Sequence, residues 1–564
     1  MPAPTSRSTR RTFLENAGKT GLAAGALGAA PGLLTAASAR GATPQAGLNL
    51  LLIMVDQLRT PWVYLSPKLQ RQTMPSVVKL GQEGVRFSNY YTSSNDCTPS
   101  RTTQATGLYT HQTAIFATTP PTDLNPGFPT WGTMLRQNGY DTYWFGKWHL
   151  SGDQNGGCEP NPYESYGFTA DWPGSGTCPS PNGGPGQGQA MDPVIRQQFR
   201  DWIGSRTAGG NPWAATVSFV NPHDIAWYPR STRRLEGQDD PPKVTTRLPV
   251  NYETVKDRRA RNKPEMQRRA QQIENESFGF MPSDRENPRL WTKQLDTYLL
   301  MQSQVDVQIS LVLSALASSP FADNTIVVFT SDHGEYGGAH GMRGKGFAFY
   351  DEGIRVPLIV KDPTGGWTKQ TKVDRQQLIE SVDLAALMLT LGTGGNDWRG
   401  NSTYAQIAGR ADIGSMLQDP KAKGRSYIAH ATDEPGTSSA IPTTQQTRPA
   451  PFHITAVRTR YGKFARYAFW KDGTLEIDTS KPVQYEAYDY GSKSGRLELD
   501  NVYGKRGASK DEKALVRKLD ALLDTAMTDE IQAPVPAALQ AAQTQAFTDW
   551  FSQPPVDFSK ATDN

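Results

Sequence analysis

Cys97 lies in a short motif that would place a nucleophile at the start of a helix. Residues 97–101 read Cys-Thr-Pro-Ser-Arg, and Gly107 follows. Proline suits the first helical position, Thr98 before it is a suitable cap, and Gly107 can end the helix. Free N–H groups at a helix start favour an anion or an anionic transition state. An unmodified Cys97 is therefore expected to be a thiol of lowered pKa.

Metal-binding and acid–base residue types follow three apolar runs. These runs, Leu48–Val55, Ala214–Val220 and Thr325–Phe329, are typical of buried strands in a mostly parallel sheet. The polar clusters at their ends are Asp56-Gln57, Asn221-Pro222-His223-Asp224 and Ser331-Asp332-His333. Ligands of open α/β sheets bind at the carboxyl ends of strands, so the three clusters are expected to share one site.

Residues 97–101 resemble the maturation signal of type I sulfatases, a family of alkaline-phosphatase-like hydrolases. In that family the cysteine is oxidised to formylglycine, which the resemblance implies for Cys97. The likeness extends over roughly Asn49 to Tyr503 and includes the segment 146–149, Gly-Lys-Trp-His. In the family, the lysine and histidine of this segment reach the sulfate and the formylglycine. A doubly negative sulfate needs cationic or N–H donors of this kind.

The resemblance also implies which residues act in the reaction. His223 matches the histidine that protonates the leaving group, and a histidine is the natural acid at neutral pH. The expected catalytic residues are Cys97, Arg101, Lys147, His149, His223 and Lys345. His111 and His340 lie near these motifs and are left open as site residues, whereas His430 and His453 are expected to be structural.

Asp56, Gln57, Asp332 and His333 resemble the family's metal ligands, and Cys97 joins them once it is modified. Many sulfatases have Asp-Asp where this chain has Asp56-Gln57, and Asp-Asn where it has Asp332-His333. Asp-Gln and Asp-His resemble choline-sulfatase-like and phosphonate-monoester-hydrolase-like relatives instead. A mainly oxygen shell suits Ca²⁺, with Mn²⁺ as the alternative because one ligand is an imidazole nitrogen.

The implied function is hydrolysis of an organic sulfate monoester, from a small molecule or a glycan, by a self-regenerating covalent nucleophile. A formylglycine-generating enzyme is the implied maturation partner. A phosphonate monoester or phosphodiester hydrolase on the same fold is the nearest alternative. An alkaline-phosphatase-type phosphotransferase fits less well, because such enzymes place Ser or Thr where Cys97 stands. An inactive metal-binding or glycan-binding protein is disfavoured by the full set of polar residues.

The elements that must position these residues predict an α/β fold. We expect a mostly parallel sheet flanked by helices over 48–395, then a smaller antiparallel sheet plus helix over 425–530. We assign no role to the tail, residues 531–564. The expected helices are Pro75–Glu83, Leu295–Leu316, Leu378–Leu391 and Asp511–Met527. The expected C-terminal strands are Tyr427–His430, Ile454–Thr459, Phe464–Trp470 and Gln484–Tyr488.

Two irregular stretches, 151–189 and 230–289, are expected to shape the substrate pocket. The second is rich in arginine, which indicates either a basic lid or, as we favour, a solvated helix face. Cys158 and Cys178 lie in the first stretch and are expected to form a disulfide after export, the alternative being two unpaired thiols.

Residues 1–39 are typical of a twin-arginine signal peptide. Arg10 and Arg11 precede a Gly/Ala/Leu stretch, and Ala37-Ser38-Ala39 offers a cleavage site. Most of the net charge of +4 belongs to this segment, so nothing indicates nucleic-acid binding. No later segment is expected to span a membrane. The twin-arginine machinery is the implied export partner, and the mature protein is expected in the periplasm or outside the cell.

Overall fold

The computed structural model describes residues 43–118, 123–151, 161–170, 183–230, 241, 243–368, 374–433 and 450–552. All of them belong to one compact unit, residues 41–564. The expected signal peptide lies outside the described residues, as do Cys158 and Cys178, so the signal and the disulfide stay predictions.

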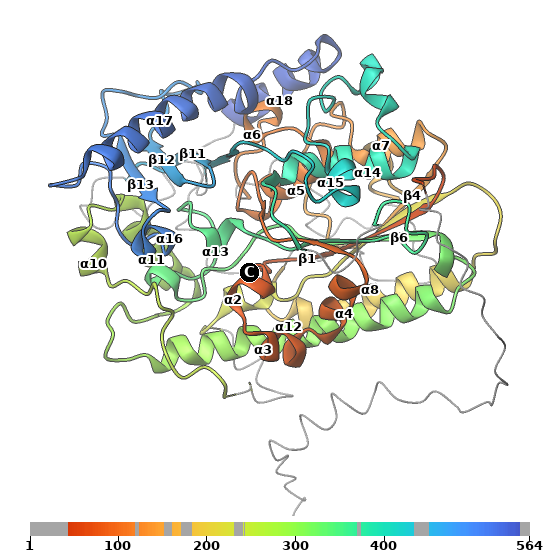
Figure 1. Ribbon diagram of the computed structural model, residues 1–564, viewed down its shortest axis with the longest axis horizontal. Helices are drawn as coiled ribbons and strands as arrows, with labels where there is room; N and C mark the ends of the chain where they lie inside the picture. Colours follow the sequence, from red (N-terminus) through yellow and green to blue (C-terminus); the bar gives the residue numbers. More distant parts are fainter. Residues whose placement is uncertain are drawn as a thin grey trace, which may run out of the picture. The chain divides into compact units, whose positions relative to one another are not determined.

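A seven-stranded, mostly parallel sheet forms the centre of this unit, which confirms the predicted fold class (Figure 1). Its order is β4-β5-β1-β6-β7-β2-β8, and only β7 runs antiparallel to its neighbours. The strands are β1 (Asn49–Val55), β2 (Val85–Phe87), β4 (Asp141–Gly146), β5 (Trp213–Ser218), β6 (Thr325–Ser331), β7 (Leu358–Lys361) and β8 (Asp374–Arg375). A separate pair joins β3 (Tyr90–Tyr91) and β9 (Ile379–Glu380). Because β4, β5, β1 and β6 are adjacent and parallel, their carboxyl ends meet at one edge.

Successive side chains of β1 point into two different cores, as the pleat of a strand requires. Leu50 packs in a core with α14, whereas Leu51 packs in a core with α12. Figure 1 shows the corresponding helices on opposite sides of the sheet. One layer contains α3 (Pro67–Thr73), α4 (Pro75–Glu83), α8 (Gln187–Gly204) and α12 (Arg289–Ala317); the other contains α5 (Cys97–Thr106), α7 (Trp131–Arg136), α14 (Leu384–Thr393) and α15 (Ile413–Gln418).

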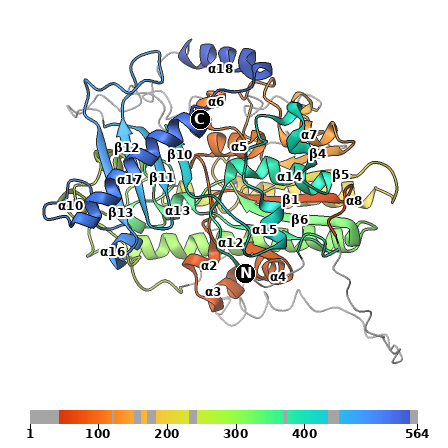
Figure 2. The same cartoon turned by 45° about the horizontal axis from the view of Figure 1, so that its top comes forward.

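The predicted C-terminal antiparallel sheet is also present. Its order is β10-β11-β12-β13. Its elements are β10 (Ile428–Thr432), β11 (His453–Arg458), β12 (Gly462–Ala468), β13 (Gln484–Asp489) and the covering helix α17 (Lys510–Ala526). Figure 2 shows α17 crossing these strands. Since both sheets belong to one compact unit, the division into two domains stays a prediction.

The described part of the tail has a packing role. Helix α18 (Gln540–Ser552) lies beside α6 (Thr110–Thr113), as Figure 2 shows. Trp550 packs against Phe116 with ring centroids 5.1 Å apart. Gln543 donates from its side chain to the Gln112 carbonyl at 3.0 Å. The tail therefore covers the loop that follows the Cys97 helix. The remaining short helices are α2 (Pro61–Tyr64), α13 (Asp351–Ile354) and α16 (Lys493–Arg496).

The described part of the arginine-rich stretch is only partly the solvated helix face that we favoured, because Arg259 is exposed but other arginines are not. It contains α10 (Val255–Ala260) and α11 (Glu265–Phe278), and both Arg258 and Arg269 are buried. Arg258 Nη2 donates to Gln271 Oε1 at 2.5 Å, which supplies a partner for its buried charge. Met266 and Ala270 of α11 pack in one core with Ile454 of the C-terminal sheet, a tertiary contact that the local sequence pattern does not reveal.

Among the described helices, α12 alone is long and apolar enough to span a membrane by length and composition, whereas we expected none. Half of its most apolar window is buried, and Val305 and Ile309 pack in the core beneath the central sheet. Its environment is therefore that of a core helix.

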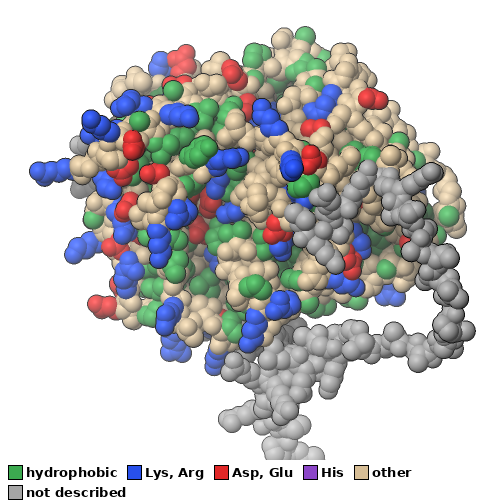
Figure 3. All heavy atoms as spheres, in the orientation of Figure 1, with side chains coloured by type: hydrophobic (Ala, Val, Ile, Leu, Met, Phe, Trp, Pro, Cys, Tyr) green, Lys and Arg blue, Asp and Glu red, His purple; other side chains and the backbone are tan. Residues whose placement is uncertain are grey.

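On the face drawn in Figure 3, basic and acidic side chains are interspersed.

Candidate active site

Asp56 and Asp332 come together because β1 and β6 pair in parallel, with Val55 opposite Ser331. Both carboxylates are fully buried, and Arg101 bridges them. Its Nη2 donates to Asp56 Oδ2 at 3.0 Å and its Nε to Asp332 Oδ2 at 2.8 Å. Arg101 therefore neutralises part of the buried charge and fixes the distance between the two carboxylates.

Gln57 is held by its backbone and by its side chain. Its φ of 67° lies in the left-handed region, which turns the chain so that its N–H donates to Asp332 Oδ1 at 3.0 Å. Its Nε2 donates to Glu335 Oε2 at 2.5 Å, which leaves Oε1 facing Lys345 Nζ at 3.3 Å. Glu335 was not predicted as a site residue. The only signal was its place three residues after Asp332 in the same polar cluster.

His333 presents a lone pair to the same point. Its Nδ1 lies 3.1 Å from the Gly334 carbonyl, which accepts only if Nδ1 carries the proton. Its Nε2 then faces Asp56 Oδ1 at 3.4 Å and Asp332 Oδ1 at 3.7 Å as an acceptor. Three buried acceptor atoms that converge in this way need a cation between them. The donor set of two carboxylates, an amide oxygen and an imidazole therefore fits a divalent metal ion.

Helix α5 begins at Cys97, two residues earlier than the motif predicted, so Thr98 is not its cap. Asp96 occupies the cap position, but its Oδ2 instead accepts from Thr432 at 2.7 Å. Gly107 ends the helix with φ 71°, as predicted. Cys97 Sγ lies 2.7 Å from Lys345 Nζ and 3.2 Å from His333 Nε2.

The pKa of the Cys97 thiol is raised, not lowered as the helix start suggested. Burial is the main cause and the charge of Asp56 adds to it, which outweighs the opposing effect of Lys147 and Lys345. An unmodified cysteine here is therefore a poor thiolate. This environment favours a nucleophile other than the thiol itself.

Two lysines supply positive charge around Cys97. Lys147 follows β4, and its Nζ lies 2.7 Å from Asp56 Oδ2 and 3.9 Å from Cys97 Sγ. Burial would lower the pKa of Lys345, but its contact with Cys97 and the charges of both aspartates raise it above its ordinary value. Lys345 is thus available as a cation for an anionic group placed beside Cys97, and Lys147 lies close to the same position.

His149 and His223 are buried near these lysines. Burial and the charge of Lys147 hold the pKa of each well below its ordinary value, so both rings are neutral when no anion is bound. The Nδ1 atom of each is buried without a hydrogen-bond partner. Gly183 lies against them, because a Cβ there would approach His223 Cε1 to 2.7 Å and Lys147 Nζ to 2.9 Å. Gly183 lies in the stretch 151–189 that was expected to shape the substrate pocket, although it was not predicted individually.

The remaining histidines do not join this group. His340 is buried in hydrogen-bonding contact with Glu253 and stacks on Tyr350 with ring centroids 3.6 Å apart. His111 packs edge-on against Phe116. His430 pairs with the Thr92 carbonyl at 2.9 Å, as expected of a structural residue.

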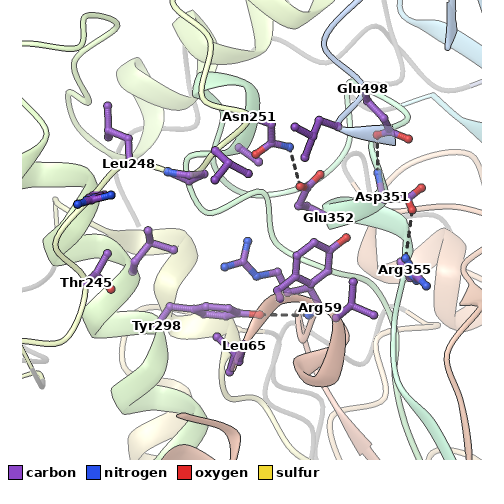
Figure 4. A pocket seen from close by; sticks show the side chains of 18 of the residues that line it. Arg59, Leu65, Thr245, Leu248, Asn251, Tyr298, Asp351, Glu352, Arg355 and Glu498 are labelled. Carbon is purple, nitrogen blue, oxygen red and sulfur yellow. Dashed lines mark hydrogen bonds and ion pairs between the residues drawn. The ribbon is translucent and has the colours of Figure 1, made fainter. Parts of the chain in front are cut away.

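A cavity of about 520 Å³ lies apart from this group (Figure 4). None of the predicted site residues lines it. Its charged walls already have partners: Asn251 donates to Glu352 at 2.8 Å, and Arg355 lies 3.6 Å from Asp351. We therefore assign it no part in binding the sulfate group.

Comparison with known proteins identifies the family. The model of the Sulfatase family matches residues 48–394. The uncharacterized sulfatase YidJ of Escherichia coli is 31% identical, over 61% of this chain and 67% of that protein. The iduronate 2-sulfatase of Homo sapiens is 28% identical, over 56% of this chain, and the match spans only 60% of that protein.

Solved structures of sulfatases and of a relative share the fold. BT1596, a 2-O GAG sulfatase, has a TM-score of 0.63 at 21% identity, covering 90% of this chain and 97% of that one. The phosphonate monoester hydrolase of Silicibacter pomeroyi has a TM-score of 0.62 at 20% identity, covering 87% and 97%. With the family model matched across the central sheet and both metal-ligand pairs, the chain belongs to the sulfatase family.

Proposed function

We propose that the protein is a sulfuric ester hydrolase acting on an organic sulfate monoester. The observation that carries this proposal is the position of Cys97. It lies between two lysines and faces two aspartates, an amide oxygen and an imidazole that converge on one point. Formylglycine made from Cys97 would supply a hydrated aldehyde as nucleophile, and a divalent cation would supply a Lewis acid beside it. Asp56, Gln57, Asp332 and His333 would hold that cation.

The chain's own residues have distinct parts in this proposal. Lys147 and Lys345 bind the sulfate oxygens and offset negative charge in the transition state. Arg101 acts as a positioning residue, because its donors hold the two aspartates. Asp332 or His149 accepts a proton when sulfate is released.

His223 is proposed to protonate the leaving alcohol. Burial and the lysines lower its pKa in the free enzyme, and the negative charge of a bound sulfate ester opposes the effect of the lysines, so the ring can take up a proton. Replacing His223 with Asn should reduce turnover far more for an alkyl sulfate than for a nitrophenyl sulfate, because a nitrophenolate leaves without protonation. An equal reduction for both esters would contradict this role.

The experiment that tests the proposed activity uses paired esters of one chromogenic alcohol. Protein co-expressed with a formylglycine-generating enzyme should hydrolyse the sulfate ester, and mass spectrometry should find formylglycine at position 97. Cys97→Ala should fold and have no activity. Activity in protein with only a free thiol at Cys97 would overturn the mechanism.

A phosphonate monoester or phosphodiester hydrolase is the second candidate. It is favoured by one observation: Gln57 places a neutral amide where many sulfatases have a carboxylate, and the combination with His333 resembles phosphonate-monoester-hydrolase-like relatives. Faster hydrolysis of the phosphonate or phosphodiester ester than of the sulfate ester would support it. The proposed metal is Ca²⁺, with Mn²⁺ as the alternative, and elemental analysis of purified protein distinguishes them.

The proposed location is the periplasm or the cell exterior, reached by the twin-arginine route. This route carries folded protein, which allows Cys97 to be modified and metal to be bound before export. Its support is Arg10 and Arg11 ahead of the apolar stretch. Replacing both with Lys should leave the full-length precursor inside the cell.

A further inference from the structure

Three buried side chains meet where the C-terminal sheet joins the catalytic part of the chain. His111 belongs to α6, Asp433 directly follows β10, and His453 begins β11. Because Thr432 pairs with Ile454 in antiparallel register, the next pair outward places Asp433 opposite His453 on the same face of the sheet. All three residues are at least 98% buried. Their ligand-type atoms lie within 4.8 Å of one another.

The polar atoms of this cluster are incompletely partnered. Asp433 Oδ1 contacts His453 Nδ1, and His111 Nδ1 lies 3.1 Å from the Thr110 hydroxyl. Asp433 Oδ2 and His111 Nε2 are buried and have no hydrogen-bond partner among the residues that the structure describes. Leaving such atoms unpaired in a protein interior is costly. Two unpaired atoms on neighbouring side chains indicate that a further group belongs between them.

The charge balance of the cluster points to a cation. Asp433 is fully buried, and its one ion-pair contact within the described part of the chain is with His453. No described lysine or arginine forms an ion pair with it. Two neutral imidazoles give an ionised Asp433 no positive partner, and a bound cation would supply one.

We propose that His111, Asp433 and His453 bind a Zn²⁺ ion at a site separate from the active site. Two imidazoles and one carboxylate are ligands that Zn²⁺ prefers, whereas Ca²⁺ prefers an all-oxygen shell. Trp470 covers the cluster, with ring centroids 4.5 Å from His453 and 5.7 Å from His111. Three side chains leave the fourth position of a tetrahedral ion to a water molecule, and the aromatic ring would shield the ion from bulk solvent.

The ion would fasten the C-terminal sheet to the segment that follows the Cys97 helix. Asp433 is next to Thr432, whose hydroxyl holds Asp96 immediately before Cys97. His111 lies four residues after the end of that helix at Gly107. The site would therefore hold both flanks of the Cys97 segment in place.

The test measures the zinc content and zinc affinity of the full-length protein, and its readout does not depend on catalytic activity. A His333→Asn background removes the imidazole from the active site. This protein should bind about one Zn²⁺ per chain, and Co²⁺ in its place should give the visible absorption of a tetrahedral ion with nitrogen ligands. His111→Gln should weaken Zn²⁺ binding at least about 100-fold, since even indirect support of a ligand is worth 10–100-fold. The matched control is His430→Gln, which changes a buried histidine of the same sheet outside the cluster and should keep the zinc.

Unchanged zinc affinity in His111→Gln would overturn the proposal. So would the absence of zinc binding in the His333→Asn protein, with circular dichroism showing that it is folded. If His111→Gln does not fold, X-ray absorption of zinc in the His333→Asn protein decides the matter. Two imidazoles in the shell support the site, and an oxygen-only shell contradicts it.

Discussion

Gln57 donates its side-chain Nε2 to Glu335 Oε2 at 2.5 Å, and both side chains are fully buried. Glu335 is itself held by the backbone N–H groups of Gly337 and Gly344, at 2.9 and 3.0 Å. This arrangement determines which end of the Gln57 amide faces the metal ligands. The oxygen faces them, and the amide nitrogen, which cannot bind a cation, is turned away.

Glu335→Gln should weaken metal binding without removing a ligand. A glutamine can offer its own NH₂ group to Gln57, which allows the Gln57 amide to flip and present nitrogen to the ion. Loss of a residue that orients a ligand typically costs 10–100-fold in metal affinity. Titration of metal into chelator-treated protein measures this. An affinity within twofold of the unmodified protein would show that Gln57 is oriented by other contacts.

Arg101→Met should destabilise the metal-free protein by about 3–5 kcal/mol, because it leaves the buried Asp56 and Asp332 without their shared partner. Arg86→Met is the control. Arg86 pairs with Asp374 at 2.7 Å near the surface, where such a pair contributes about 0–1 kcal/mol. Urea unfolding in the presence of a chelator compares the two variants. Equal effects would mean that the Arg101 bridge adds no more stability than a surface pair.

The sequence predicted that Asp56 and Asp332 lie together, because their placement follows from local patterns. The apolar runs before Asp56 and Asp332 are typical of buried parallel strands, and neighbouring parallel strands bring their carboxyl ends together. The role of Glu335 could not be predicted in the same way. Its bond to Gln57 joins residues 278 positions apart and depends on the left-handed backbone at Gln57.

The start of the Cys97 helix shows the same limit. The residue preferences at helix N-termini predicted Thr98 as the cap and Pro99 as the first helical residue. The structure starts the helix at Cys97, after Asp96. The Asp96 side chain is directed away from the helix by Thr432, which is 336 residues distant. Capping preferences are worth about 1 kcal/mol, so one buried tertiary hydrogen bond is enough to override them.

Glu253→Gln should lower stability in a pH-dependent way. Burial alone would raise the pKa of Glu253, but the hydrogen bond with His340 and the charge of Lys263 lower it from 4.5 to about 2. The folded pKa lies below the unfolded one, so the ionised carboxylate stabilises the fold above pH 4.5, and this contribution is lost as the pH falls toward 2. A depression of this size corresponds to about 3 kcal/mol at neutral pH.

Urea unfolding of Glu253→Gln and of the unmodified protein, from about pH 7 to about pH 3, measures this contribution. The difference in free energy of unfolding should be largest at neutral pH and should narrow on acidification. Glu476→Gln is the control, because Glu476 pairs with Lys471 on the surface and its loss should change stability little at any pH. A difference for Glu253→Gln that does not vary with pH would contradict the assignment of its charge.

Gly183→Ala should impair catalysis through His223 and Lys147. The φ of Gly183 is 96°, and an added Cβ would lie 2.7 Å from His223 Cε1 and 2.9 Å from Lys147 Nζ. Both side chains must then move by a fraction of an ångström or more, and misplacement of catalytic groups by about 1 Å can cost 10²-fold in rate. We expect kcat/KM to fall by about 10- to 100-fold.

Gly209→Ala is the matched control, because Gly209 has a φ of 98° and open space around its Cβ position. It carries the same backbone strain without the contact, so its kcat/KM should be unchanged while its stability falls as in Gly183→Ala. If the two variants lose activity equally, backbone strain is the cause, and Gly183 has no specific relationship to the site.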